Sequence, residues 1–138
     1  MQRVTGIGGI FFRARDPKAL ARWYTEALGI DGYAEEQDRT WWQEAGPTVF
    51  APFEQETDYF GRREQQAMLN FRVEDLDAML AQLRDAGAAV DEKVEEMAGI
   101  GRFGWATDPE GNRFELWEPA PEARVRPTEA GYCVVRRL

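Results

Sequence analysis

Apolar and polar positions follow the same order twice along the chain. Residues 7–14 and 67–73 alternate between the two kinds with a period of two, which predicts a β-strand in each place. Asp16 and Asp75 then begin stretches with apolar residues at helical spacing, and a glycine follows each stretch. Aspartate favours the start of a helix and glycine the position just after its end. The pattern therefore predicts a strand followed by a helix in each half.

Shorter strand candidates complete each half. They are short pieces between residues 33 and 50, and residues 90–97, 101–106 and 113–117. The segment Ile10–Asp16 also matches Leu69–Asp75 in register. The two halves therefore predict an α+β fold made of a duplicated βαβββ unit, in which a helix covers one face of each small sheet.

A tight turn joins the last two strand candidates. Its sequence, Asp-Pro-Glu-Gly-Asn at residues 108–112, suits a hairpin because Pro fixes one backbone angle and Gly or Asn accepts a positive φ. The strand after the turn carries Glu115, a carboxylate that can point inward. Any function that needs this carboxylate depends on the partners it finds.

The chain divides into one domain and a tail. We expect a single domain at 1–119, with modules at about 6–52 and 66–119, a polar linker at 53–65 and a C-terminal tail at 120–138. Prolines predict an extended start to the tail, whereas residues 131–137 have strand propensity and can pair with a sheet edge. Cys133 in this tail is interpreted as a free structural or surface thiol.

Composition narrows the classes of function. A net charge of −8, from 17 basic and 25 acidic residues, disfavours a nucleic-acid partner. No apolar run is long enough for a membrane span and no signal peptide is evident, which predicts a cytoplasmic protein. The chain contains no histidine, the commonest metal ligand and the commonest general base near neutral pH. Any catalysis must therefore use carboxylates, Arg, Lys, Tyr or Cys.

The duplicated unit and two sequence motifs resemble the vicinal oxygen chelate superfamily, which includes glyoxalase I, bleomycin-resistance proteins and extradiol dioxygenases. The motifs are Gly-Ile-Gly-Gly-Ile-Phe-Phe-Arg-Ala-Arg-Asp-Pro near the N-terminus and Asp-Pro-Glu-Gly-Asn-Arg-Phe-Glu-Leu-Trp-Glu-Pro at 108–119. The resemblance implies two βαβββ modules that form a curled, cup-like mixed sheet with the helices outside. It also implies a small-molecule ligand inside the cup and a homodimer.

The resemblance also implies where a metal would be held. In metal-using members the ligands come from the first strand of each module and the last strand of one or both, and the matching positions here are Gly9, Met68, Glu115 and Thr48 or Val49. Glycine offers no ligand atom, and a thioether suits soft ions better than the usual divalent ones. We therefore expect no family-type divalent metal and no other cofactor.

Parity with those family positions divides the strand residues between two faces. The groove side is expected to carry Phe11, Arg13, Met68, Asn70, Arg72, Glu115 and Trp117, whereas Ile10, Phe12, Leu69, Phe71, Val73, Phe114 and Leu116 pack beneath the helices. Trp42 is a further candidate for ligand binding. A few polar groups among aromatic surface are typical of a small-molecule site.

Several of these candidates have two interpretations. Arg13 and Arg72 occupy equivalent positions, and they either bind an anionic or planar ligand or form a structural ion pair with Glu115, which we favour. Trp42 and Trp117 line the ligand site or pack in the core or a dimer contact. Glu115 acts as a catalytic acid or base or is a structural carboxylate.

The resulting hypothesis is a glyoxalase-like and bleomycin-resistance-like protein that binds an anionic or aromatic compound without the family metal. One alternative is a glyoxalase-type lyase or isomerase that uses Glu115 as acid or base or an unconventional metal site. Another is a non-catalytic dimer or interaction module. The sequence leaves open the identity of the ligand, whether the protein is catalytic, and whether the cup closes within one chain or across a dimer.

Overall fold

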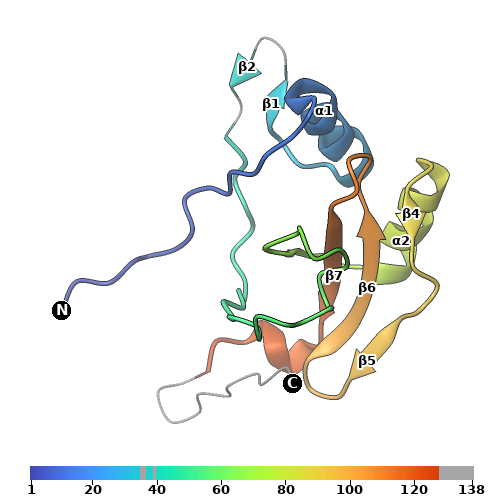
Figure 1. Cartoon of the computed structure of the whole chain (residues 1–138). Coiled ribbons are helices and arrows are strands. Elements are labelled where there is room, and N and C mark those ends of the chain that lie inside the picture. Colours follow the sequence, from blue (N-terminus) through green and yellow to red (C-terminus); the bar gives the residue numbers. More distant parts are fainter. Residues whose placement is uncertain (35–36, 39, 128–138) are drawn as a thin grey trace.

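The computed structural model describes residues 1–34, 37–38 and 40–127, and these residues fold into two α-helices against an open mixed sheet (Figure 1). The elements are α1 (Pro17–Leu28), β1 (Tyr33–Ala34), β2 (Gln37–Asp38), β3 (Leu69–Arg72), α2 (Leu76–Asp85), β4 (Ala89–Val90), β5 (Glu95–Met97), β6 (Gly101–Thr107), β7 (Arg113–Pro119) and the 3-10 helix η1 (Pro121–Arg124). The α+β class predicted from the sequence is confirmed.

The second half forms the predicted βαβββ unit. Its sheet has the order β3-β7-β6-β4, and β5 also pairs with β6. β3 runs parallel to β7, and β6 and β7 form the antiparallel hairpin expected around the Asp-Pro-Glu-Gly-Asn turn. The strand expected at 90–97 is instead two short strands, β4 and β5, and the residues 91–94 between them, three of which are charged, belong to neither strand.

Both helices begin as the sequence predicts. The side chain of Asp16 accepts a hydrogen bond from the amide of Ala19, and that of Asp75 accepts one from the amide of Ala78. Each carboxylate thereby satisfies an amide that has no partner within the first helical turn. At the end of α1, Gly29 adopts a left-handed conformation with φ 70°, which glycine reaches without strain.

The main core lies between the two helices and one face of the sheet. It contains Leu20, Tyr24, Ala27, Leu76, Leu80, Leu83, Ala106, Phe114 and Leu116, and Leu69, Phe71 and Val73 pack against it. The residues of the second half that were expected to pack beneath the helices therefore lie in this core. Since side chains alternate along a strand, the other face of the same strands carries Asn70, Glu115 and Trp117.

The first half departs from the prediction. Residues 7–14 form no strand, and the pieces expected between 33 and 50 are reduced, in the described part of the chain, to the two-residue strands β1 and β2. Ile10 and Phe12, expected beneath α1, are 50% and 51% exposed, although Phe12 keeps an edge contact with the ring of Tyr24. A strand needs a neighbouring edge to pair with, and Figure 1 shows the N-terminal segment running away from the sheet.

The tail begins differently from the expected extended segment. Residues 121–124 form η1, the side chain of Arg124 donates to the carbonyl of Pro119, and Ala123 packs against the cluster of Phe103, Trp105 and Trp117. Cys133 and the strand expected at 131–137 lie outside the described residues. The domain boundaries drawn from the sequence stay a prediction.

Candidate functional site

The face of the five-stranded sheet opposite the helices carries an aromatic cluster. Phe103, Trp105 and Trp117 are buried there, and Tyr59, Met68, Met97, Ile100 and Ala123 pack against them. We call this surface the aromatic face. It results from simple alternation on β6 and β7, because Trp105 pairs with Glu115 and Phe103 with Trp117.

Glu115 lies at the centre of the aromatic face and is 1% exposed. The side-chain amide of Asn70 on β3 donates to its Oε1 at 2.5 Å, and the indole N–H of Trp105 on β6 donates to its Oε2 at 3.0 Å. The hydroxyl of Tyr59 also donates to Oε2. Charge-assisted hydrogen bonds of this kind offset the cost of burying a carboxylate. Three parts of the chain thus converge on one acidic group.

Tyr59 reaches Glu115 from the segment expected to be a polar linker. We call residues 53–65 the strap, because they run along the side of β7 that faces away from α2 (Figure 1), where Tyr59 packs against the aromatic face. The ring of Tyr59 stacks on Phe53 at a centroid distance of 5.5 Å and meets Trp105 edge-on at 6.2 Å. The strap therefore covers Glu115 with aromatic side chains of its own. Tyr59 and Trp105 were absent from the predicted site.

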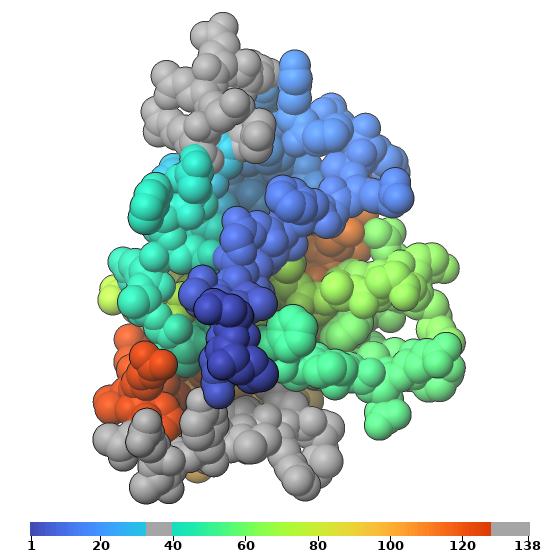
Figure 2. Space-filling view, turned by 90° about the vertical axis from the view of Figure 1, so that its left-hand side faces the viewer, coloured from blue at the N-terminus to red at the C-terminus, as the bar shows by residue number. Residues whose placement is uncertain are grey.

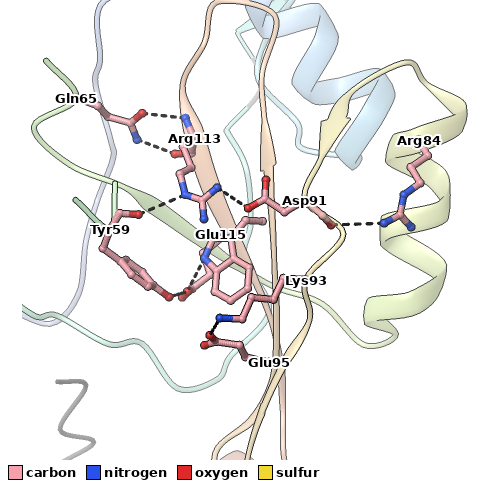
Figure 3. Close-up of polar contacts among 9 residues, drawn as sticks. Tyr59, Gln65, Arg84, Asp91, Lys93, Glu95, Arg113 and Glu115 are labelled. Carbon is pink, nitrogen blue, oxygen red and sulfur yellow. Dashed lines mark hydrogen bonds and ion pairs between the residues drawn. The ribbon is translucent and has the colours of Figure 1, made fainter. Parts of the chain in front are cut away.

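The strap is tied to the first residue of β7. The side-chain amide of Gln65 donates to the carbonyl of Arg113 at 2.7 Å and accepts from its backbone N–H at 2.8 Å (Figure 3). The Nε–H of Arg113 donates to the carbonyl of Tyr59 at 3.3 Å. The strap is thus held at both Tyr59 and Gln65 by polar groups at the start of β7.

Arg113 also stands beside the aromatic cluster. Its guanidinium lies 5.6 Å from the ring centroid of Trp105 and forms a 2.8 Å ion pair with Asp91. Both side chains of the pair are partly exposed, and the cation over the indole adds a cation–π contact. Arg113 was not predicted, although it shares strand parity with Glu115, which was the available signal.

The structure brings together some of the predicted site residues and not others. Glu115, Asn70, Met68 and Trp117 lie on the aromatic face. Trp117 is 4% exposed, stacks parallel to Phe103 with centroids 6.0 Å apart, and donates its indole N–H to the carbonyl of Ile100. Phe11, Arg13 and Trp42 lie in exposed segments of the first half, where Phe11 is 95% and Trp42 88% exposed.

The favoured ion pair between Glu115 and an arginine of the repeat is not found among the described residues. Arg72 instead donates to the carbonyls of Glu44 and Pro47, at 2.8 and 3.0 Å. Its guanidinium thus holds the loop at 44–47, where carbonyl groups offer it acceptors. Arg13 is exposed, because the strand expected to carry it toward the groove has not formed.

The turn before β7 fixes the strand that presents Glu115. The carboxylate of Asp108, 4% exposed, accepts hydrogen bonds from the hydroxyl of Tyr24, the amide of Glu110, and the backbone and side-chain amides of Asn112. Burial, followed by the contact with Asp108, raises the pKa of Tyr24 and keeps its hydroxyl protonated. Asp108 therefore stabilises the turn through Glu110 and Asn112 and connects the turn to α1 through Tyr24.

Glu110 makes a second connection between this turn and α1. Its carboxylate accepts hydrogen bonds from the backbone amides of Arg15, at 2.5 Å, and Asp16, at 3.1 Å. A negative charge at this position also suits the positive end of the helix dipole. The motif that suggested a functional carboxylate thus has Asp108 and Glu110 in structural roles.

The residues at the implied metal positions do not fit a divalent ion. Gly9 has no side chain to offer, Met68 offers a thioether within the aromatic cluster, and both oxygens of Glu115 already accept hydrogen bonds. Across the part of the chain that the structure describes, no three or more Asp, Glu or Cys side chains gather where they could hold a metal.

A family model described as a glyoxalase-like domain matches residues 9–117. The chain belongs to the glyoxalase-like domain family. A search of curated proteins finds no match. Within the described residues, no helix of this glyoxalase-like domain is long and apolar enough to cross a membrane.

Solved structures share the glyoxalase-like fold at low sequence identity. TnmS3, an antibiotic binding protein from Streptomyces sp. CB03234, is 23% identical with a TM-score of 0.56, over 87% of this chain and 100% of its own. A glyoxylase/bleomycin resistance protein/dioxygenase domain from Frankia sp. EAN1pec is 21% identical with a TM-score of 0.57, over 86% and 100%. The fosfomycin resistance protein FosX from Listeria monocytogenes is 10% identical with a TM-score of 0.55, over 88% and 96%. These likenesses show the fold.

Proposed function

We propose that this glyoxalase-like domain binds a small molecule on the aromatic face and does so without a family-type metal. The observation that carries the proposal is the engagement of Glu115, whose two oxygens accept hydrogen bonds from Asn70, Trp105 and Tyr59. An ion at Glu115 would have to replace these donors and find its remaining ligands elsewhere. Phe103, Trp105 and Trp117 supply the flat apolar surface of a ligand site.

A structural neighbour supports the binding role by analogy. TnmS3 shares the fold and is described as an antibiotic binding protein. Since one fold hosts many functions, the analogy supports a class of activity, the binding of an organic small molecule, and leaves the compound open. The predicted preference for an anionic or aromatic compound gives the first set to screen.

We further propose that two chains pair and that each supplies first-half residues to the cup. Apolar side chains of the first half are left exposed in the single chain: Ile7, Ile10, Phe11, Phe12, Trp41, Trp42, Val49 and Phe50. An apolar surface of this kind is typical of an interface. In the dimer, Phe11, Arg13 and Trp42 of the first half, together with Arg72 on β3 of the second, contact the ligand. The cytoplasmic location stays a prediction from the sequence.

A thermal-shift screen with aromatic and anionic compounds tests the binding role. A compound at 100 times its dissociation constant is expected to add about 2.7 kcal/mol to the free energy of unfolding. The same shift is expected after treatment with a chelator. Elemental analysis after incubation with Zn²⁺, Ni²⁺, Mn²⁺ and Fe²⁺ is the companion measurement, and one tightly held ion per chain would contradict the metal-free site.

A second candidate function is a glyoxalase-type lyase or isomerase in which Glu115 moves a proton. The observation that favours it is the hydroxyl of Tyr59, which donates its exchangeable proton in a hydrogen bond to the carboxylate. If this function is correct, Glu115→Gln abolishes turnover of a compound that still binds. Unchanged turnover would remove Glu115 from the reaction.

A further inference from the structure

Tyr59 occupies the aromatic face as a bound phenol would. Its ring lies between Phe53 and the edge-on indole of Trp105, and its hydroxyl donates to the buried carboxylate of Glu115. Figure 3 shows the side chain pointing from the strap toward Glu115. A flat ring and a hydrogen-bond donor are therefore already accommodated at this position.

In the described part of the chain, the strap has exposed polar contacts besides those of Tyr59 and Gln65. Arg62 donates to the side chain of Asn112 at 3.4 Å, and Arg63 pairs with Glu56 within the strap through side chains that are 67% and 72% exposed. Exposed pairs of this kind contribute little to stability. In Figure 2 the strap is part of the surface facing the viewer, beside the N-terminal segment. Segments with exposed polar contacts open at a lower free energy than core strands.

The charges around Glu115 determine which chemical group of a ligand can replace the hydroxyl of Tyr59. A buried carboxylate accepts hydrogen bonds and repels anions, so an anionic group is disfavoured at this point. The nearby cation Arg113 pairs with Asp91, and Arg72 donates to backbone carbonyls. The groups at the centre of the face therefore favour a donor over an anion.

We propose that Tyr59 is an internal stand-in for the ligand, and that the site takes a phenol or another flat aromatic with a hydrogen-bond donor. Such a ligand displaces Tyr59 from Glu115 and Trp105 and lifts the strap. The inference rests on the proposed binding function and names the ligand class for the same site. It narrows the sequence-based preference from anionic or aromatic to aromatic with a donor.

The direct test removes the stand-in. Tyr59→Ala leaves a space shaped for phenol, and the probes are phenol and benzene, with binding to the full chain measured by calorimetry. Phenol is expected to bind the variant roughly 10- to 100-fold more tightly than benzene, because it restores a hydrogen bond to a charged acceptor. Phenol is also expected to bind the variant at least about tenfold more tightly than the wild type, where Tyr59 competes.

Phe60→Ala is the matched control. Phe60 is a half-buried ring of the same strap that packs on Phe53, so the change removes an aromatic ring without removing the hydroxyl at Glu115. This variant is expected to bind phenol as the wild type does. Equal binding of phenol and benzene to Tyr59→Ala, or an equal gain in Phe60→Ala, would overturn the inference.

A second measurement keeps the test decisive if Tyr59→Ala fails to fold. Arg62 and Arg63 are exposed in the strap and are trypsin sites, so saturating phenol is expected to increase cleavage of the wild-type strap several-fold as the strap lifts. Tyr59→Phe keeps the ring, loses the hydroxyl, and should need less phenol for the same effect. Cleavage that phenol slows or leaves unchanged would overturn the inference.

The two proposals fail in different ways. A screened compound that stabilises the protein while the strap stays as resistant to trypsin as before overturns the stand-in and leaves the binding function standing. The absence of stabilisation by every screened compound, together with no binding of phenol to the wild type or the variants, overturns both.

Discussion

The hydroxyl of Tyr24 on α1 donates a 2.7 Å hydrogen bond to the carboxylate of Asp108 in the turn between β6 and β7. The two residues are 84 positions apart in the sequence. This contact ties the helix of the first half to the hairpin of the second, although the described residues of the first half contribute no strand to the five-stranded sheet. It therefore helps to set the position of β7, and with it that of Glu115.

Tyr24→Phe is expected to lower the free energy of unfolding by roughly 1–3 kcal/mol, because a buried acceptor loses one donor. Asp108 keeps its hydrogen bonds from Glu110 and Asn112, so the lower end of this range is expected. Urea unfolding measures the change. A double-mutant cycle with Asp108→Ala should show a coupling free energy between the two positions, and purely additive effects would contradict the contact.

Alkaline pH is expected to lower the free energy of unfolding, because the buried phenol of Tyr24 holds its proton in the folded state. Burial first, and then Asp108, raise the pKa of this phenol, so the folded state holds the proton more tightly than the unfolded chain does. The stability linked to this proton is complete below the ordinary tyrosine pKa of about 10 and is lost progressively as pH rises above it. Unfolding followed from pH 8 to 11 should show a steeper loss for the wild type than for Tyr24→Phe. Parallel curves would be the contrary result.

Glu115→Gln is expected to lower the free energy of unfolding by roughly 1–3 kcal/mol. The amide has one acceptor oxygen in place of two, yet Asn70, Trp105 and Tyr59 all present donors to this side chain. Its NH2 group would then face one of those donors. Chemical denaturation measures the loss.

The matched control for Glu115 is Glu95→Gln on β5. Glu95 is a partly exposed carboxylate that pairs with Lys93 at the surface, so its replacement is expected to change stability by less than about 0.5 kcal/mol. Equal losses for the two variants would mean that the hydrogen bonds at Glu115 contribute no more than a surface pair.

Gly104→Ala is expected to destabilise the fold by roughly 1–3 kcal/mol through overpacking. A Cβ at this position of β6 would lie 3.1 Å from one methyl carbon of Leu80 and 3.4 Å from one of Leu76, both on the buried face of α2. Gly32→Ala is the comparison, since no heavy atom of the described residues, its chain neighbours aside, lies within 4 Å of its added Cβ. The difference between their unfolding midpoints in urea checks the prediction, and equal midpoints would refute it.

The second half was predictable because its signals are local. Alternation at 67–73, the N-cap Asp75 and the turn at 108–112 each act within a few residues, and each is found in the structure. The first half has the same signals, and its helix is correct. β3 finds the edge of β7 to pair with, whereas residues 7–14 pair with no strand, and a local pattern does not show whether such an edge is available.

The site was predicted in part for the same reason. Strand parity placed Asn70, Glu115 and Trp117 on one face correctly. Tyr59 was missed because the strap shows no periodicity, and its contact with Glu115 spans 56 positions in the sequence. The expected ion pair between Glu115 and an arginine of the repeat is not among the described contacts. Arg72 donates instead to backbone carbonyls in the loop at 44–47.

The two hydrogen bonds between Gln65 and Arg113 allow opening of the strap to be measured at a single backbone amide. The side chain of Gln65 satisfies both the N–H and the C=O of Arg113. The amide proton of Arg113 is therefore sheltered by the strap, and its exchange with deuterium follows each opening of that segment. The exchange rate of this one amide thus measures how often the strap opens and exposes Glu115, in the wild-type protein without a ligand.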